Sequence, residues 1–296
     1  MGESFRVACV QVNAGDEMAE NLARAAKLIR EAHAAGADFV ATPENVSMMT
    51  SGRDNAFAKA APEASHAALA AFRALSRELG IWLLVGSLSV RLEGGRDERG
   101  EDAPRLANRS FLLDRQGAIV GRYDKIHMFD VNLSSGQSYR ESESFRPGAA
   151  AELVDTPWGP LGMTVCYDLR FAHLYRALAQ AGARFLAIPS AFTRVTGEAH
   201  WHVLQRARAI ETGSFVIAPA QCGSHVGGRQ TFGHSLIVDP WGEVLADGGE
   251  SPGVVMAEIE PARVRESRAR VPALTHDRAF SGPEPALSEP KIRATA

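Results

Sequence analysis

The hydrophobic pattern in the first third of the chain follows two periods in turn. Residues 5–12 alternate apolar and polar positions as a strand does, and residues 17–35 carry apolar side chains at helical spacing. The pattern then predicts three further elements: a strand over 38–42, a helix over 62–79 and an apolar strand over 81–90. This β-α-β-α-β order is typical of α/β proteins.

After residue 109 the pattern changes to short strands joined by tight turns. Strands are predicted over 109–114, 118–123, 151–156, 161–166, 185–190, 214–222, 234–239, 243–248 and 253–260, and helices over 171–181, 198–212 and from 261. Strand–helix units combined with antiparallel hairpins favour an α/β fold in which two sheets pack face to face. With helices on the outer faces, this is a four-layer α-β-β-α sandwich.

The composition shows no sign of a domain boundary. No linker rich in Pro, Gly or Ser divides the chain, so we expect a single domain over residues 1–296. Segment 91–105 is charged and Gly-rich, which predicts an exposed loop between two strands. Residues after about 277 are rich in Pro, Ser and charge, and we expect them to form a C-terminal tail that leaves the core.

The charge balance argues against nucleic acid as a partner. The formal net charge of -3 gives no overall field that attracts phosphate backbones or anionic membranes. No segment approaches the ~18 consecutive apolar residues of a membrane span, and the first residues lack the apolar run of a secretory leader. Cys9, Cys166 and Cys222 lie far apart, as is usual in a reducing compartment. We therefore expect a cytoplasmic protein with no membrane partner.

Three polar residues stand at predicted strand ends, where reactive groups of α/β proteins concentrate: Glu44, Lys125 and Cys166. Singly, each has a more common role, because a Cys after an apolar strand is usually a buried filler and a Glu or Lys beside a turn is usually solvated. Together they match thiol-based amide hydrolysis. A thiol with a pKa of about 8.5 needs a base to become a good nucleophile, and a nearby ammonium stabilises a negative oxygen.

The segments around these residues resemble a known family. PEN at 43–45, YDKIHMFD at 123–130 and CYDLRF at 166–171 are similar to the Glu, Lys and Cys motifs of the nitrilase (carbon-nitrogen hydrolase) superfamily, and the likeness covers nearly the whole chain. The segment APAQCGSHVGGRQTFGHS at 218–235 is similar to the Nit branch, which holds deaminated glutathione amidase and omega-amidase, and is nearer the former.

The resemblance implies a mechanism without metal or organic cofactor. Cys166 attacks an amide carbon, and Lys125 together with the backbone N–H of Tyr167 holds the oxyanion. Glu44 takes the thiol proton, passes it to departing ammonia and then activates water to hydrolyse the thioester. Glu141 aligns with a second glutamate that orients the lysine, although Glu143 is an alternative from the sequence.

Substrate recognition follows less directly from the sequence. Arg170 lies four residues after Cys166, close enough in sequence for a bidentate grip on a substrate carboxylate, whereas an ion pair of Arg170 with Asp168 is the structural alternative. The resemblance places Thr196 at the same carboxylate end. Three aromatic side chains could line the pocket: Tyr139, His127 and Trp201. Aromatic residues near strand ends more commonly serve in packing. The pair of His200 and His202 does not suggest a metal site, because residues two apart on a helix face different directions.

The sequence therefore predicts an amidase acting on a small carboxylate-bearing amide, with deaminated glutathione as the expected substrate. The alternatives are omega-amidase activity on 2-oxoglutaramate, hydrolysis of N-carbamoyl amino acids, and an inactive scaffold on the same fold. By analogy with the family, we expect a homodimer or a larger even homo-oligomer.

Overall fold

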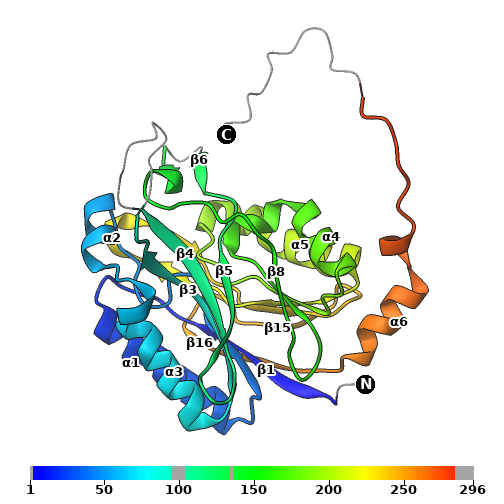
Figure 1. Ribbon diagram of the computed structural model, residues 1–296, viewed down its shortest axis with the longest axis horizontal. Coiled ribbons are helices and arrows are strands. Elements are labelled where there is room, and N and C mark those ends of the chain that lie inside the picture. Colours follow the sequence, from blue (N-terminus) through cyan, green and yellow to red (C-terminus); the bar gives the residue numbers. More distant parts are fainter. Residues whose placement is uncertain (1–2, 95–104, 134–135, 284–296) are drawn as a thin grey trace.

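A computed structural model describes residues 3–94, 105–133 and 136–283, and its core is a pair of six-stranded sheets (Figure 1). The first sheet has the order β16 (Gly253–Ile259), β1 (Phe5–Gln11), β2 (Phe39–Ala41), β3 (Trp82–Arg91), β4 (Leu106–Leu113) and β5 (Ile119–Asp124). The second has the order β15 (Val244–Asp247), β14 (Leu236–Val238), β11 (Phe215–Ala218), β10 (Phe185–Ala187), β9 (Leu161–Met163) and β8 (Glu152–Val154). Each sheet has three parallel central strands and antiparallel outer strands.

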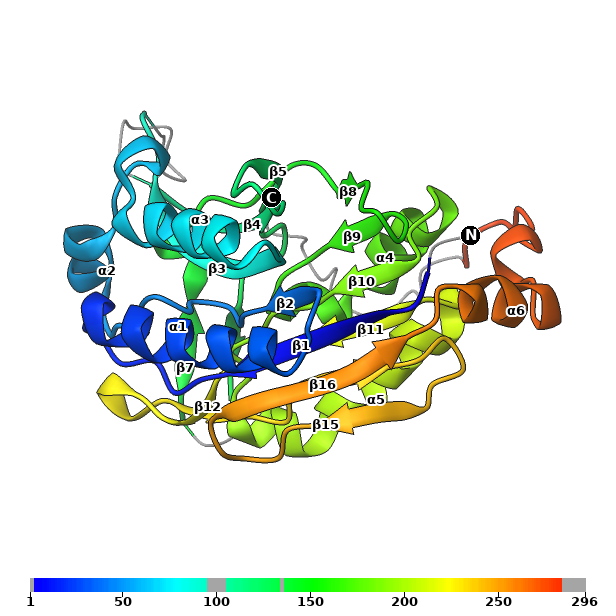
Figure 2. The same cartoon turned by 90° about the horizontal axis from the view of Figure 1, so that it is seen from below.

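Helices cover the outer face of each sheet. On the first sheet, α1 (Met18–Ala34) and α3 (Ala67–Leu79) lie side by side (Figure 2), and on the second lie α4 (Ala172–Gln180) and α5 (Arg194–Thr212). The molecule therefore has the predicted four layers, and the predicted α/β fold is confirmed. The shorter elements are α2 (Arg53–Lys59), α6 (Ala262–Arg270), η1 (Glu63–Ser65), η2 (Glu141–Glu143), η3 (Cys166–Arg170), η4 (Val226–Gly228), η5 (Ala273–Thr275), β6 (Asp130–Asn132), β7 (Ser138–Arg140), β12 (Cys222–Ser224) and β13 (Gln230–Phe232).

The alternation of side chains along β1 explains how one sheet serves two cores. Val7 and Cys9 are buried in the core between the two sheets, whereas Ala8 and Val10 belong to the core beneath the helices α1 and α3. Between Arg6 and Gln11, β1 is therefore continuously apolar rather than alternating as predicted, and β3 is buried from Trp82 to Val90, because a strand covered on both faces has little room for polar positions. Burial of each large apolar side chain contributes roughly 1.5–3 kcal/mol to folding.

Several element boundaries differ from the sequence prediction. The helix predicted from 62 begins at Ala67, after the separate turn η1, and the helix predicted from 198 begins at Arg194. The strand predicted over 214–222 is divided into β11 and β12, because Pro219 has no N–H to donate to a sheet. The short hairpins β6–β7 and β12–β13 and the helix α2 were not predicted.

Two predicted peripheral segments are only partly visible. Most of the predicted loop 91–105 lies outside the described residues, as do residues 284–296 of the predicted tail. The first part of the tail follows α6 and leaves the sheets, with the carboxylate of Asp277 bonded to Arg176 and Gln180 on α4 (Figure 1). In the described part of the chain, no helix combines the length and the apolar character required to cross a bilayer.

Candidate active site

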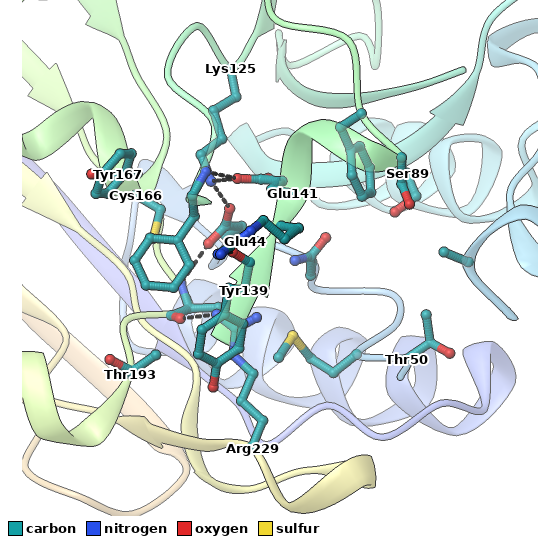
Figure 3. Close-up of a pocket in the computed structure, with 18 of the residues that line it drawn as sticks. Glu44, Thr50, Ser89, Lys125, Tyr139, Glu141, Cys166, Tyr167, Thr193 and Arg229 are labelled. Carbon is teal, nitrogen blue, oxygen red and sulfur yellow. Dashed lines mark hydrogen bonds and ion pairs between the residues drawn. The ribbon is translucent and has the colours of Figure 1, made fainter. Parts of the chain in front are cut away.

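Glu44, Lys125 and Cys166 meet at the ends of three strands, in a cavity of about 310 Å³ (Figure 3). Glu44 follows β2 and Lys125 follows β5, which both end at the same edge of the first sheet, while Cys166 follows β9 in the facing sheet. The three side chains line one cavity, and each residue is at most 5% exposed. The structure thus brings together three residues that lie far apart in the sequence.

A close backbone contact sets the turn that carries Glu44. Gly86 on β3 lies so near the end of β2 that a Cβ on it would be 2.0 Å from the carbonyl oxygen of Thr42. Its N–H donates to Oγ1 of Thr42 (3.1 Å), and the hydroxyl of Ser87 accepts a hydrogen bond from the N–H of Asn45 (2.9 Å). Asn45 has a φ of +55°, which turns the chain sharply after Glu44.

The ammonium group of Lys125 is held between two carboxylates. Its Nζ lies 3.1 Å from Oε1 of Glu44 and 2.7 Å from Oε2 of Glu141. Burial alone would lower the pKa of Lys125, but the charges of Glu141 and Glu44 outweigh burial and raise this pKa well above its usual value. Lys125 is therefore a permanent cation, although its side chain is only 2% exposed.

Glu44 is fixed by donors on both carboxylate oxygens. Nδ2 of Asn108 donates to Oε1 (2.8 Å), and the N–H of Ala191 donates to Oε2 (2.8 Å). Burial raises the pKa of Glu44, but the cations Lys125 and Arg229 oppose it, and together with the hydrogen bonds they lower the pKa below its usual value. The carboxylate is thus ionised in the resting site and can accept a proton.

Cys166 begins the turn η3 in a backbone conformation that few non-glycine residues adopt. Its φ is +50°, and its N–H donates to the carbonyl oxygen of Pro189 (3.0 Å). Burial, and next the negative charge of Glu44, raise the pKa of the Cys166 thiol, although Lys125 partly opposes them. The thiol is therefore protonated at rest and needs to lose its proton to Glu44 as it attacks.

The backbone N–H of Tyr167 is available for an anion. It donates to no acceptor among the described residues, because it lies in the first turn of η3 where helical N–H groups have no partner. Lys125 lies in the same cavity. The site thus contains an ammonium and a free N–H next to the thiol, the two kinds of donor that an oxyanion requires.

Two residues of the site were missed by the sequence analysis. Asn108 on β4 donates from one Nδ2 to both Glu44 (2.8 Å) and Glu141 (3.0 Å), so it links the two acids. Arg229 lines the cavity, lies over the ring of Tyr139 (5.3 Å) and donates to the carbonyl oxygen of Ala191 (2.5 Å). A polar residue inside the apolar strand around 108 was a usable signal, whereas Arg229 gave none.

The structure distinguishes Glu141 from Glu143. Glu141 contacts Lys125 and accepts a hydrogen bond from the N–H of Phe129 (2.7 Å). Glu143 also lines the cavity, but it is exposed and reaches neither Lys125 nor Asn108. The geometry therefore favours Glu141 as the residue that orients the lysine.

The expected substrate-binding residues are only partly placed at the cavity. Tyr139 and Thr196 line it, but Arg170 does not. Its guanidinium lies over the ring of Phe192 (5.2 Å), and its Nη2 lies 3.3 Å from Nδ1 of His200. This placement does not support the predicted carboxylate grip by Arg170.

The alternative ion pair of Arg170 with Asp168 does not form either, because Asp168 is bonded to His127 and to Tyr123. His127 and Trp201, two suggested pocket walls, pack elsewhere: His127 stacks on Phe171 (3.5 Å between centroids), and Trp201 is fully buried.

The other thiols lie outside the cavity. Cys9 and Cys222 are fully buried, and burial raises the pKa of Cys222 to about 11. A group of metal-ligating type, made of His202, His234 and Asp247, also lies away from the cavity.

Comparison with known proteins places this geometry in a family. The sequence profile of the family described as "Carbon-nitrogen hydrolase" matches residues 6–269. The chain belongs to the carbon-nitrogen hydrolase family. It is therefore a hydrolase of carbon–nitrogen bonds other than peptide bonds, as predicted.

Members of the carbon-nitrogen hydrolase family resemble this chain over nearly its full length. It is 38% identical to a deaminated glutathione amidase of Yersinia enterocolitica, covering 98% of both chains, and 40% identical to the Homo sapiens deaminated glutathione amidase, covering 92% of this chain and 82% of that one. Omega-amidase NIT2 of Homo sapiens is 32% identical, covering 93% of this chain and 95% of its own. The crystal structure of Saccharomyces cerevisiae Nit3 superposes with a TM-score of 0.81 at 28% identity, covering 94% and 97%.

Proposed function

We propose that this chain is a cysteine-dependent amidase whose nucleophile is Cys166 and whose proton carrier is Glu44. The observation that carries the proposal is the convergence of a protonated thiol, an ionised carboxylate and a permanent ammonium in one cavity. A nucleophile, a base and a cation are the groups that amide hydrolysis through a thioester requires.

In acylation, Cys166 bonds to the substrate while Glu44 first accepts and then returns a proton. The thiol proton of Cys166 passes to Glu44 as Sγ bonds to the amide carbon, and the oxygen that becomes negative is stabilised by Lys125 and the N–H of Tyr167. When the intermediate collapses, the carbon–nitrogen bond breaks and Glu44 returns the proton to the departing nitrogen. A thioester on Cys166 remains.

Deacylation reverses the roles. Glu44, ionised again, takes a proton from water as the water oxygen bonds to the thioester carbon. The carbon–sulfur bond then breaks and the proton goes back to Cys166, so that amide and water become carboxylic acid and amine. Glu141 and Asn108 keep Lys125 and Glu44 in place throughout, because they are bonded to these two residues and to each other.

We infer that the substrate is deaminated glutathione, after the names of the similar proteins. This substrate has two carboxylates, and three arginines line the cavity: half-buried Arg229 and exposed Arg53 and Arg140. Its scissile amide is substituted at nitrogen, so the leaving group is the amine of cysteinylglycine. The ammonia expected from the sequence is the leaving group only of a primary amide such as 2-oxoglutaramate.

The two activities are separated by steady-state kinetics on the purified chain. We expect kcat/KM for deaminated glutathione to exceed that for 2-oxoglutaramate by at least tenfold, with free cysteinylglycine rather than ammonia as the measured product. A higher kcat/KM for 2-oxoglutaramate would assign the chain to the omega-amidases. The cytoplasmic location remains a prediction from the composition, and the homodimer or larger even assembly remains a prediction from the resemblance.

A further inference from the structure

Three side chains able to bind a metal converge outside the cavity. His202 lies on α5, His234 lies two residues before β14, and Asp247 ends β15. Their ligand atoms lie within 4.8 Å of one another, and no other such group of three occurs among residues 3–94, 105–133 and 136–283. The amidase chemistry uses none of them.

Both imidazoles point at the same carboxylate. Nε2 of His202 lies 2.9 Å from Oδ2 of Asp247, and Nδ1 of His234 lies 2.9 Å from Oδ1. The ring centroids of the two histidines are 5.1 Å apart and the ring planes differ by 71°. A tetrahedral ion with bonds of about 2.0–2.1 Å keeps its ligands about 3.3 Å apart. The two nitrogen–oxygen distances would therefore open by a few tenths of an ångström around an ion, and the two imidazole nitrogens lie within 4.8 Å of each other.

The fold holds this group in place. The N–H of His234 donates to the carbonyl oxygen of Gly249 (2.6 Å), and the carbonyl oxygen of His234 accepts from Nε1 of Trp201 (2.7 Å). Oδ1 of Asp247 accepts from the N–H of Gly249 (2.9 Å), and Phe232 stacks on the ring of His234 (4.4 Å). The ligand positions are therefore set before any ion arrives.

Solvent reaches this group of three side chains, and the second nitrogen of each imidazole ring can carry the ring proton. The side chains of His202, His234 and Asp247 are 37%, 21% and 34% exposed. The second ring nitrogens, Nδ1 of His202 and Nε2 of His234, bond to no residue that the structure describes. Each histidine can thus move its proton to that nitrogen and offer a lone pair to an ion.

We propose that His202, His234 and Asp247 bind one divalent transition-metal ion of the zinc class. Two imidazoles and one carboxylate suit Zn²⁺, Co²⁺ or Ni²⁺, whereas Mg²⁺ and Ca²⁺ prefer sites made of oxygen atoms. Because the ligands come from α5, the segment before β14 and the end of β15, a bound ion links these three parts of the chain. The ion stabilises the second sheet and its helix and takes no part in amide hydrolysis.

The test is calorimetric titration of the chelator-treated chain with zinc chloride, together with thermal unfolding. We expect saturable binding of one equivalent, and a rise in Tm of roughly 5 °C at a hundredfold excess over Kd. His202→Gln and Asp247→Asn should each weaken binding at least tenfold while unfolding normally without metal. His200→Ala is the matched control, because it lies on the same helix but contacts Arg170, and it should bind like the wild type.

Cobalt distinguishes this group from the thiols. Co²⁺ bound to imidazole and carboxylate shows only weak visible bands, whereas Co²⁺ bound to Cys166 or Cys222 adds a strong sulfur-to-metal band in the near ultraviolet. We expect the spectrum without sulfur, lost in His202→Gln. Absence of saturable binding, a sulfur band, or equal affinity in wild type and His202→Gln would each overturn the proposal.

Discussion

Two buried carboxylates are associated with the nucleophile, Glu44 by direct contact and Asp168 through the turn η3, and they differ in their partners. Asp168 is fully buried and accepts hydrogen bonds from the hydroxyl of Tyr123 (2.7 Å), the N–H of Val165 (2.9 Å), and both the N–H (3.0 Å) and Nδ1 (2.7 Å) of His127. All of these donors are fixed parts of the fold. Asp168 therefore stabilises the turn that carries Cys166.

Glu44 has two fixed donors of the same kind, from Asn108 and Ala191, but it also faces Lys125 and the thiol of Cys166. The protonation of the thiol changes during the proposed reaction, so this carboxylate needs to accept and release a proton. Burial alone does not show which carboxylate is reactive. The reactive carboxylate is the one whose partners include a group that gains and loses a proton.

Replacing the nucleophile should have the largest effect. Cys166→Ala is expected to lower kcat for deaminated glutathione by a factor of about 10⁴ or more, because no thioester can form. Cys222→Ala is the matched control, since that thiol is buried outside the cavity, and it should keep nearly full activity. Activity of the Cys166 variant close to wild type would contradict the mechanism.

Glu44→Gln keeps the shape of the side chain but removes the base. We expect kcat to fall by roughly 10²–10⁴ because neither the thiol proton nor the water proton has an acceptor. Because Lys125 keeps its pair with Glu141 and the amide oxygen still accepts from one of the two fixed donors, the Tm should fall less than in Asp168→Asn. A large loss of Tm with normal activity per folded molecule would make Glu44 a structural residue like Asp168.

Asp168→Asn tests the other half of the comparison. We expect it to lower the free energy of unfolding by about 2–4 kcal/mol, because an amide cannot accept all the hydrogen bonds that the carboxylate does. Urea unfolding measures this loss. The kcat of the folded variant should fall less than that of Glu44→Gln, and a larger fall would assign Asp168 to the chemistry.

Arg229→Ala asks whether the charge next to Glu44 also binds the substrate. We expect KM for deaminated glutathione to rise about tenfold with a smaller change in kcat, since a charge-assisted hydrogen bond contributes about 1.5–3 kcal/mol. Arg140→Ala, which removes an exposed arginine from the same cavity, is the control and should raise KM much less. Equal effects of the two variants would remove the special role of Arg229.

The pH profile should show the smallest effect. The pKa of Glu44 is lowered, so the active carboxylate form is present above that pKa and is lost as the pH falls through it. The pKa of the Cys166 thiol and that of Lys125 are raised, so neither group titrates near neutrality. We expect kcat/KM to be level from about pH 6 to 8, with an acid limb below. An inflection near pH 7 would indicate a different base.

The sequence predicted the reactive groups better than their supports. Glu44, Lys125 and Cys166 each follow a strand. Reactive groups of α/β proteins concentrate at strand ends, so their convergence could be expected. The four layers could be predicted as well, because the hydrophobic periods showed strand–helix units combined with antiparallel hairpins. Arg229 lies at the β12–β13 hairpin, whose position depends on contacts between distant segments, so the pattern around it contained no information about the cavity.

The placement of Arg170 outside the cavity lining has a similar origin. Closeness in sequence to Cys166 suggested closeness in space, but a short helical turn rotates each successive side chain away from the last. Arg170, at the end of η3, consequently lies outside the cavity lining, with its guanidinium over the rings of Phe192 and Tyr167. Closeness in sequence predicts closeness of side chains in space poorly inside a helical turn.

The contact at Gly86 has a consequence for attempts to change which amides this enzyme accepts. Any side chain at that position would collide with the peptide of Thr42 and displace the segment that carries Glu44. A randomised library aimed at a wider cavity should therefore spare this glycine and vary lining residues on other elements, such as Tyr139 on β7 and Thr196 on α5. Active members of a fully random library should still encode glycine at codon 86.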